Sequence, residues 1–216
     1  MSDWERTLAG AAERYADGLA RLPEDPDARQ RQLTRTGNAA GAAALSLRML
    51  GRPGEAAEWF RRAAERYRES WEGAPPGSWG RPIGAIKSRL LAGDVAGAEA
   101  DSRWALEAGA AAAESPIGGY AAALALLTLG RDGEAAAQAE RIRRAEGFPP
   151  DVGDALLALA AGDAAGYETA VSSVLRSFET RTEYLEDIPV ADTVLVLQEL
   201  AAPRGLAVGL ASELLP

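Results

Sequence analysis

The sequence contains no cysteine and no histidine. Their absence excludes disulfides, thiol nucleophiles, the usual zinc ligands and every catalytic triad that uses an imidazole as its base. It also suits a reducing compartment. The N-terminus shows neither the basic nor the apolar region of a signal peptide, so we expect a cytoplasmic protein. Lysine and asparagine occur once each, as Lys87 and Asn38.

Positive charge is scarce as well. The 216 residues carry 23 basic and 32 acidic side chains, which gives a net charge of −9. Because phosphate binding needs a basic face, we expect no nucleic-acid partner. The longest apolar run, near residues 120–129, is too short to cross a bilayer, so we expect no membrane partner either. An acidic chain can meet a basic partner, although many proteins are simply acidic.

With imidazole and thiol absent, any catalysis would depend on carboxylates. Acidic clusters occur around Asp25 and around Asp151, and both lie at predicted helix starts, where carboxylates cap N–H groups and complement the helix dipole. No phosphate-binding loop and no calcium-loop pattern is present. We therefore expect no catalysis, no cofactor and no metal site.

Glycine and proline divide the chain into short helical segments. The clearest pair of helices spans Ala42 to Tyr67 and breaks at residues 51–54, and further break glycines stand at positions 93, 130 and 162. Apart from the short run 206–208, nothing alternates with the period of a strand. The sequence predicts one all-α domain over residues 1–216 with about ten helices. It divides into residues 1–72 with the clearest repeat, an irregular loop at 73–82, and weaker repeats over 83–216.

The first helix pair resembles the tetratricopeptide repeat in its turn and second helix. Gly51 matches the turn glycine, Ala56 and Ala63 the small packing positions, and Phe60 the aromatic position. The intervals between break glycines shorten along the chain and bracket the family's period of about 34 residues. The resemblance implies a degenerate array of helical hairpins, wound as a right-handed superhelix, whose first helices line a concave groove.

A second resemblance covers the C-terminal third. Residues 157–168, the Ile188-Pro189 break, Arg204-Gly205-Leu206 and the terminal Leu214-Leu215-Pro216 follow one another as in the family-49 immunity proteins of bacterial polymorphic-toxin systems. That resemblance implies an all-helical cytoplasmic protein that binds and neutralises a cognate toxin. It brings no distinctive polar motif, so it assigns no site residue.

The tetratricopeptide resemblance also places candidate binding residues on the groove face. They are Asn38 and Arg48 in the first hairpin and Arg81 and Lys87 in the second, so this half is expected to bind an acidic or carboxylate-bearing ligand. The same face of the later hairpins carries only apolar groups and is predicted to be core or a hydrophobic surface. Trp79, in the irregular loop, either fills a gap between helices or anchors a partner.

Arginines and glutamates alternate along residues 55–71. Their spacing predicts a solvated helix face with i,i+4 ion pairs rather than a docking patch.

Two classes of function follow from these patterns. The first is a non-catalytic protein-binding module, such as an immunity protein, whose partner is a toxin or a peptide. The alternative is a regulatory or structural module that acts through self-association.

Overall fold

The computed structural model describes residues 2–216 and confirms the all-α prediction. These residues form ten α-helices and no strand: α1 (Asp3–Ala20), α2 (Pro26–Met49), α3 (Pro53–Trp71), α4 (Gly80–Leu91), α5 (Val95–Glu107), α6 (Pro116–Thr128), α7 (Asp132–Arg143), α8 (Pro150–Ala161), α9 (Ala164–Glu179) and α10 (Asp192–Ala201). Three short 3-10 helices join them: η1 (Ala110–Ala112), η2 (Leu185–Asp187) and η3 (Ala202–Arg204).

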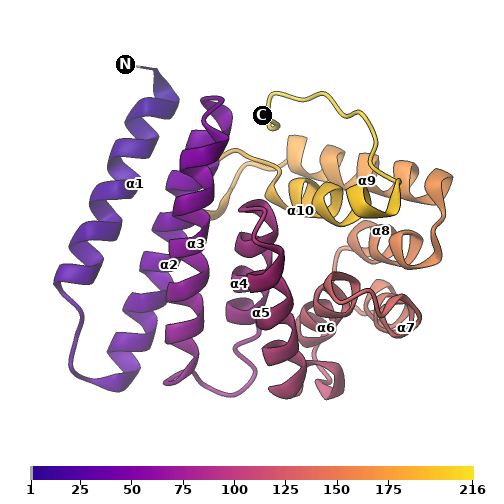
Figure 1. The fold of residues 1–216 in the computed structure, drawn as a ribbon, viewed down its shortest axis with the longest axis horizontal. Coiled ribbons are helices and arrows are strands. Elements are labelled where there is room, and N and C mark those ends of the chain that lie inside the picture. The colour runs from indigo at the N-terminus through magenta and orange to yellow at the C-terminus, as the bar shows by residue number, and fades with distance from the viewer. Residues whose placement is uncertain (1) are drawn as a thin grey trace.

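The helices pack as a row of hairpins (Figure 1). After α1, which lies against α2, the pairs α2–α3, α4–α5, α6–α7 and α8–α9 follow in chain order, each in contact with the next. Helix α10 leaves this row and returns across it to contact α4, α8 and α9. The face that α10 crosses is called the inner face below. The right-handed superhelix stays a prediction.

All four hairpin turns are built in the same way. Gly51, Gly93, Gly130 and Gly162 each have a φ between 66° and 71°, the left-handed region that glycine enters without a steric penalty. The residue after each glycine donates its backbone N–H to a carbonyl five residues earlier, for example Arg52 to Leu47 at 2.9 Å. These bonds satisfy carbonyls at the end of the first helix and turn the chain back on itself.

Two side-chain chemistries alternate from one turn to the next. In the first and third turns an arginine makes a bidentate ion pair with the glutamate three residues on, Arg52 with Glu55 and Arg131 with Glu134. In the second and fourth turns an aspartate accepts the backbone N–H of a glycine three residues on, as Asp94 does from Gly97 at 3.0 Å. A Cβ on Gly97 would lie 2.4 Å from the Asp94 carboxylate, so a larger residue there would require this carboxylate to shift.

Two predicted boundaries are wrong. The loop predicted at residues 73–82 ends at Trp79, because Gly80, Arg81 and Pro82 form the first turn of α4. Proline is tolerated there since a first-turn N–H has no helical partner. The break at Ile188-Pro189 predicts that the helix beginning at Ala164 continues to about residue 186, but this helix ends at Glu179.

Small and apolar side chains fill the interior. Helix α6 is buried around its whole circumference from Gly118 to Leu127, so it is the central helix of the row. Leu124, Leu127, Leu156 and Leu159 on the inner face are at most 1% exposed, which confirms that this half is core. None of the helices in residues 2–216 is long and apolar enough to cross a membrane.

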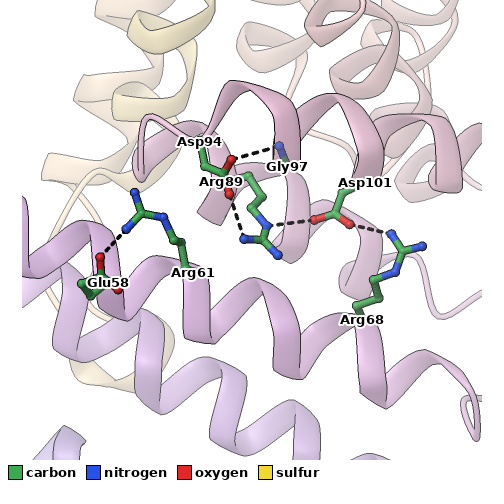
Figure 2. Close-up of polar contacts among 7 residues, drawn as sticks. All are labelled: Glu58, Arg61, Arg68, Arg89, Asp94, Gly97 and Asp101. Carbon is green, nitrogen blue, oxygen red and sulfur yellow. Dashed lines mark hydrogen bonds and ion pairs between the residues drawn. The ribbon is translucent and has the colours of Figure 1, made fainter.

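Polar contacts join the first two hairpins on their outer side (Figure 2). The buried Asp101 carboxylate on α5 accepts from Arg68 of α3 at 2.7 Å and from Arg89 of α4 at 3.4 Å. Arg68 also lies over the Trp104 ring. Arg61 instead pairs with Glu58 on its own helix. The predicted solvated face of α3 is therefore only partly free, and Arg68 holds α3 against the second hairpin.

The turn glycines supply a matched test within one turn. We expect Gly130→Ala to lower the free energy of unfolding by about 1 kcal/mol, because alanine strains the left-handed backbone. Gly133→Ala, three residues on, lies inside α7 in open space and should be neutral or stabilising by up to about 1 kcal/mol. Urea unfolding measures both values. Equal losses in the two variants would contradict the assigned turn geometry.

Asp101 supplies the second test. We expect Asp101→Ala to destabilise the protein by about 2 kcal/mol, because it removes the charge-assisted hydrogen bonds from Arg68 and Arg89 that join the two hairpins. Glu99→Ala, two residues away, removes only an exposed pair with Arg103 and should change stability by less than about 1 kcal/mol. Thermal and urea unfolding would measure the difference, and similar effects of the two substitutions would show that Asp101 does not join the hairpins.

Candidate functional site

A cavity of about 430 Å³ lies on the inner face between α2 and α4. Its walls include Leu45, Phe60, Ile83 and Leu91, which are apolar, and its polar residues include Thr34 and three of the predicted binding residues, Asn38, Arg81 and Lys87. Its roof is formed by part of residues 180–191, the segment that joins α9 to α10 and is called the strap below. Figure 1 shows this segment reaching from the end of α9 toward α2 and α3 before it returns to the start of α10.

Asn38 owes its position to a tyrosine that passes between the two wall helices. Tyr67 of α3 is buried, and its hydroxyl donates to the Asn38 side-chain oxygen at 2.8 Å. A Cβ on Gly37 would lie 3.0 Å from the Tyr67 ring and one on Gly84 2.7 Å from it, so glycine on both wall helices makes room for the ring. Burial and the nearby negative charges of Asp192 and Glu186 raise the pKa of the Tyr67 hydroxyl.

Lys87 lies at the opposite wall and is already paired. Its ammonium group contacts the Asp192 carboxylate at 2.5 Å and the Thr193 hydroxyl at 3.4 Å, both at the start of α10. Burial is the largest single influence and lowers the pKa of Lys87, but the charge and hydrogen bond of Asp192 together with Tyr120 outweigh it, and the net pKa is raised. Burial has the opposite effect on a neutral acid, and it raises the pKa of the nearby Tyr120 hydroxyl. Lys87 is therefore a fixed positive charge whose partner comes from the same chain.

Two cations that line the cavity have no ion pair within residues 2–216: Arg181 of the strap, which is exposed and lies over the Phe178 ring, and the half-buried Arg81 of α4. The Arg81 guanidinium donates to the neutral side-chain oxygen of Gln30, and its Nε is buried without a hydrogen-bond partner. Among residues 2–216, no carboxylate lies within ion-pair distance of it. Burial lowers the pKa of Arg81, as expected for a cation that no anion compensates. Arg81 therefore places an uncompensated positive charge on the helical wall of the cavity.

The remaining two predicted residues lie outside the cavity. Arg48 is on the same inner face, where it contacts Glu199 of α10 at 3.8 Å. Trp79 is 8% exposed and packs against Trp71 with ring centroids 5.6 Å apart, near Gly118 of α6. It fills a gap between helices, which is the first of its two predicted roles, and it takes no part in the cavity.

The strap was not predicted from the sequence. Its Tyr184 hydroxyl donates to the Phe178 carbonyl at 2.7 Å, close to where α9 ends. Glu186 forms an ion pair with Arg14 of α1 at 3.3 Å, and Leu185 between them is 69% exposed. The Ile188-Pro189 break marks the end of the strap, but neither glycine nor proline marks its start at Thr180. No local sequence pattern therefore predicted the segment that covers the cavity.

Comparison with protein-family models, with curated protein sequences and with solved structures gives no match. The tetratricopeptide and family-49 resemblances therefore stay predictions. Within residues 2–216, no group of three or more carboxylates is arranged to hold a metal ion.

The buried tyrosines and Lys87 predict how stability changes at high pH. Their pKa values are raised in the folded state, whereas the unfolded chain releases these protons near the ordinary values of 10.0 and 10.5. Stability is therefore complete below about pH 10 and falls as the pH rises above it. We expect the free energy of unfolding of Tyr67→Phe to fall less steeply above about pH 10, by up to about 1.4 kcal/mol per pH unit.

Urea unfolding between pH 8 and pH 11 measures this slope. At the lower end Tyr67→Phe should cost about 1 kcal/mol, because Asn38 loses its donor. A slope that matches the wild-type protein would show that the Tyr67 hydroxyl is not buried in the way described.

Proposed function

We propose that this protein is a non-catalytic binding module that holds a segment of a protein partner on the Arg81 side of the inner-face cavity. The observation that carries the proposal is the combination of apolar walls with a half-buried guanidinium that no carboxylate neutralises. Ligand sites are mostly apolar pockets of about 300–1,000 Å³ with a few convergent polar groups. Arg81 favours a carboxylate on the partner, because a planar guanidinium binds this group through two parallel hydrogen bonds.

The non-catalytic part of the proposal rests on side-chain chemistry. The chain has no histidine or cysteine. Asp192 raises the pKa of Lys87 overall, so its amine stays protonated and is a poor nucleophile. The groups that line the cavity are suited to recognition rather than to bond making.

The resemblance to family-49 immunity proteins supports one biological role for such a module. In that role the protein is bacterial and cytoplasmic and neutralises a cognate toxin by binding it. Self-association is the alternative, and it has less support. The large hydrophobic side chains exposed among the described residues are Val95, Ile117 and Leu185, which lie on three separate elements and form no continuous apolar patch.

Arg81→Gln tests this proposal against the matched control Arg103→Gln on the exposed surface of α5. Wild type and both variants are used in parallel to capture proteins from cells of the native source, and the purified partner is then titrated by calorimetry. We expect Arg81→Gln to weaken binding by at least about tenfold, because a charge-assisted hydrogen bond is lost, and Arg103→Gln to bind as wild type does.

Circular dichroism must show that all three proteins fold. A partner that binds all three with equal affinity would contradict the cavity as the binding site. Protection of toxin-producing cells by the wild type, but not by Arg81→Gln, would support the toxin-neutralising role.

A further inference from the structure

The strap occupies the inner face as a bound peptide would. Ile188 and Val190 are buried and Tyr184 is half-buried, whereas Glu183, Leu185 and Asp187 are exposed. Within residues 184–190, Tyr184, Ile188 and Val190 thus lie against the inner face, and the acidic Glu186 and Asp187 lie at its edge. In helical-repeat arrays this face is the surface on which partners bind.

Little polar contact holds the strap in place. The backbone N–H groups of residues 181, 187, 188 and 190 donate to carbonyls of the strap itself or of the end of α9. Within residues 2–216, no backbone hydrogen bond joins residues 181–190 to α2 or α4. The ion pair between Glu186 and Arg14 links the strap to the N-terminal helices, and the Arg14 side chain is 50% exposed. Glu186 is 22% exposed, and an ion pair with one exposed partner contributes at most about 1 kcal/mol, because water and salt screen it.

The backbone of the strap is also strained. Glu186 and Asp187 both have a φ of 56°, and they are the non-glycine residues with positive φ among the described ones. The left-handed conformation brings Cβ close to the following carbonyl oxygen in every residue except glycine. Strain of this kind persists only where the surroundings impose it, and it concentrates at binding sites and switch regions. Releasing the strap from the inner face relieves it.

We propose that the strap is a displaceable occupant of the inner face, and that the partner segment which replaces it is an extended acidic peptide with apolar side chains, as residues 183–190 are. This inference rests on the proposed function and adds the chemistry of its ligand. Arg81 has no carboxylate partner while the strap is closed, because the strap is tied at its two ends to α9 and α10. A free segment lacks these ties, so it shifts along the inner face until one of its acidic groups pairs with Arg81. The Lys87–Asp192 pair stays closed and holds α10 in place.

A synthetic peptide with the sequence of residues 181–192, labelled with a fluorophore, is the probe. Its binding to the full-length chain is followed by fluorescence anisotropy. We expect Arg14→Ala to bind it about three- to fivefold more tightly than wild type, because the strap has lost its ion pair. We expect Arg81→Gln to bind it about tenfold more weakly. Arg103→Gln should match wild type, and a peptide with its acidic residues replaced by amides should bind none of the proteins.

Hydrogen exchange supplies an independent readout. Amides of residues 182–187 should exchange faster than those of α9 and α10, and should exchange faster still when the peptide is bound, because the peptide displaces them. Failure of Arg14→Ala to bind the peptide, or binding that slows exchange in the strap, would overturn the displacement proposal. Formation of a dimer on sedimentation would also overturn it, because a second copy would then be the occupant.

This result is separable from the test of the proposed function. If a protein partner binds in an Arg81-dependent way while the strap amides stay protected from hydrogen exchange, the cavity is the binding site but the strap is not displaced. That result would contradict the displacement proposal alone.

Discussion

The ion pair between Lys87 and Asp192 decides how the inner face of this protein is filled. A buried ammonium group requires a compensating charge, and the carboxylate that supplies it lies 105 residues away at the first turn of α10. This contact fixes α10 across the apolar half of the inner face, where the leucines of α6 and α8 are buried. The strap must then cross the other half to reach α10, and the cavity is the space that it leaves open.

The hairpin turns determine what lines that space. Each turn uses a left-handed glycine to reverse the chain, so the first helices of the hairpins all face the same side. Gly37 and Gly84 then let Tyr67 pass between α2 and α4 and hold Asn38 in position. Arg81 is the second residue of α4, and its guanidinium donates to the neutral side chain of Gln30 on α2. The polar end of the cavity therefore consists of Asn38, which Tyr67 holds in position, and the uncompensated charge of Arg81.

Local signals made much of this fold predictable from the sequence. The break glycines and the proline positions placed most helices to within a few residues, apart from the end of α9. The acidic ligand expected at the groove stays a prediction, since Lys87 and Arg48 already face carboxylates on the inner face. Those carboxylates belong to Asp192 and Glu199 of the same chain.

The rest depends on contacts between residues far apart in the sequence. Nothing near Thr180 marks the end of α9, because the hydroxyl that caps Phe178 comes from Tyr184 and the strap is held by packing against α2 and α4. The pairing of Arg68 with Asp101 likewise joins two hairpins, and the spacing of arginines along one helix cannot reveal it. Trp79 is buried because it lies between Trp71 of α3 and Gly118 of α6, which are far apart in the sequence.

The central claim is that a partner binds at the inner-face cavity, and the composition of the chain offers a direct measurement. Asn38 is the single asparagine and Lys87 the single lysine, so selective isotope labelling gives one asparagine side-chain amide and one lysine ammonium for NMR. When a purified partner is titrated in, the Asn38 amide signals should shift as binding saturates. The Lys87 ammonium should remain protonated and paired with Asp192. Saturable binding that leaves the Asn38 signals unmoved would contradict the claim.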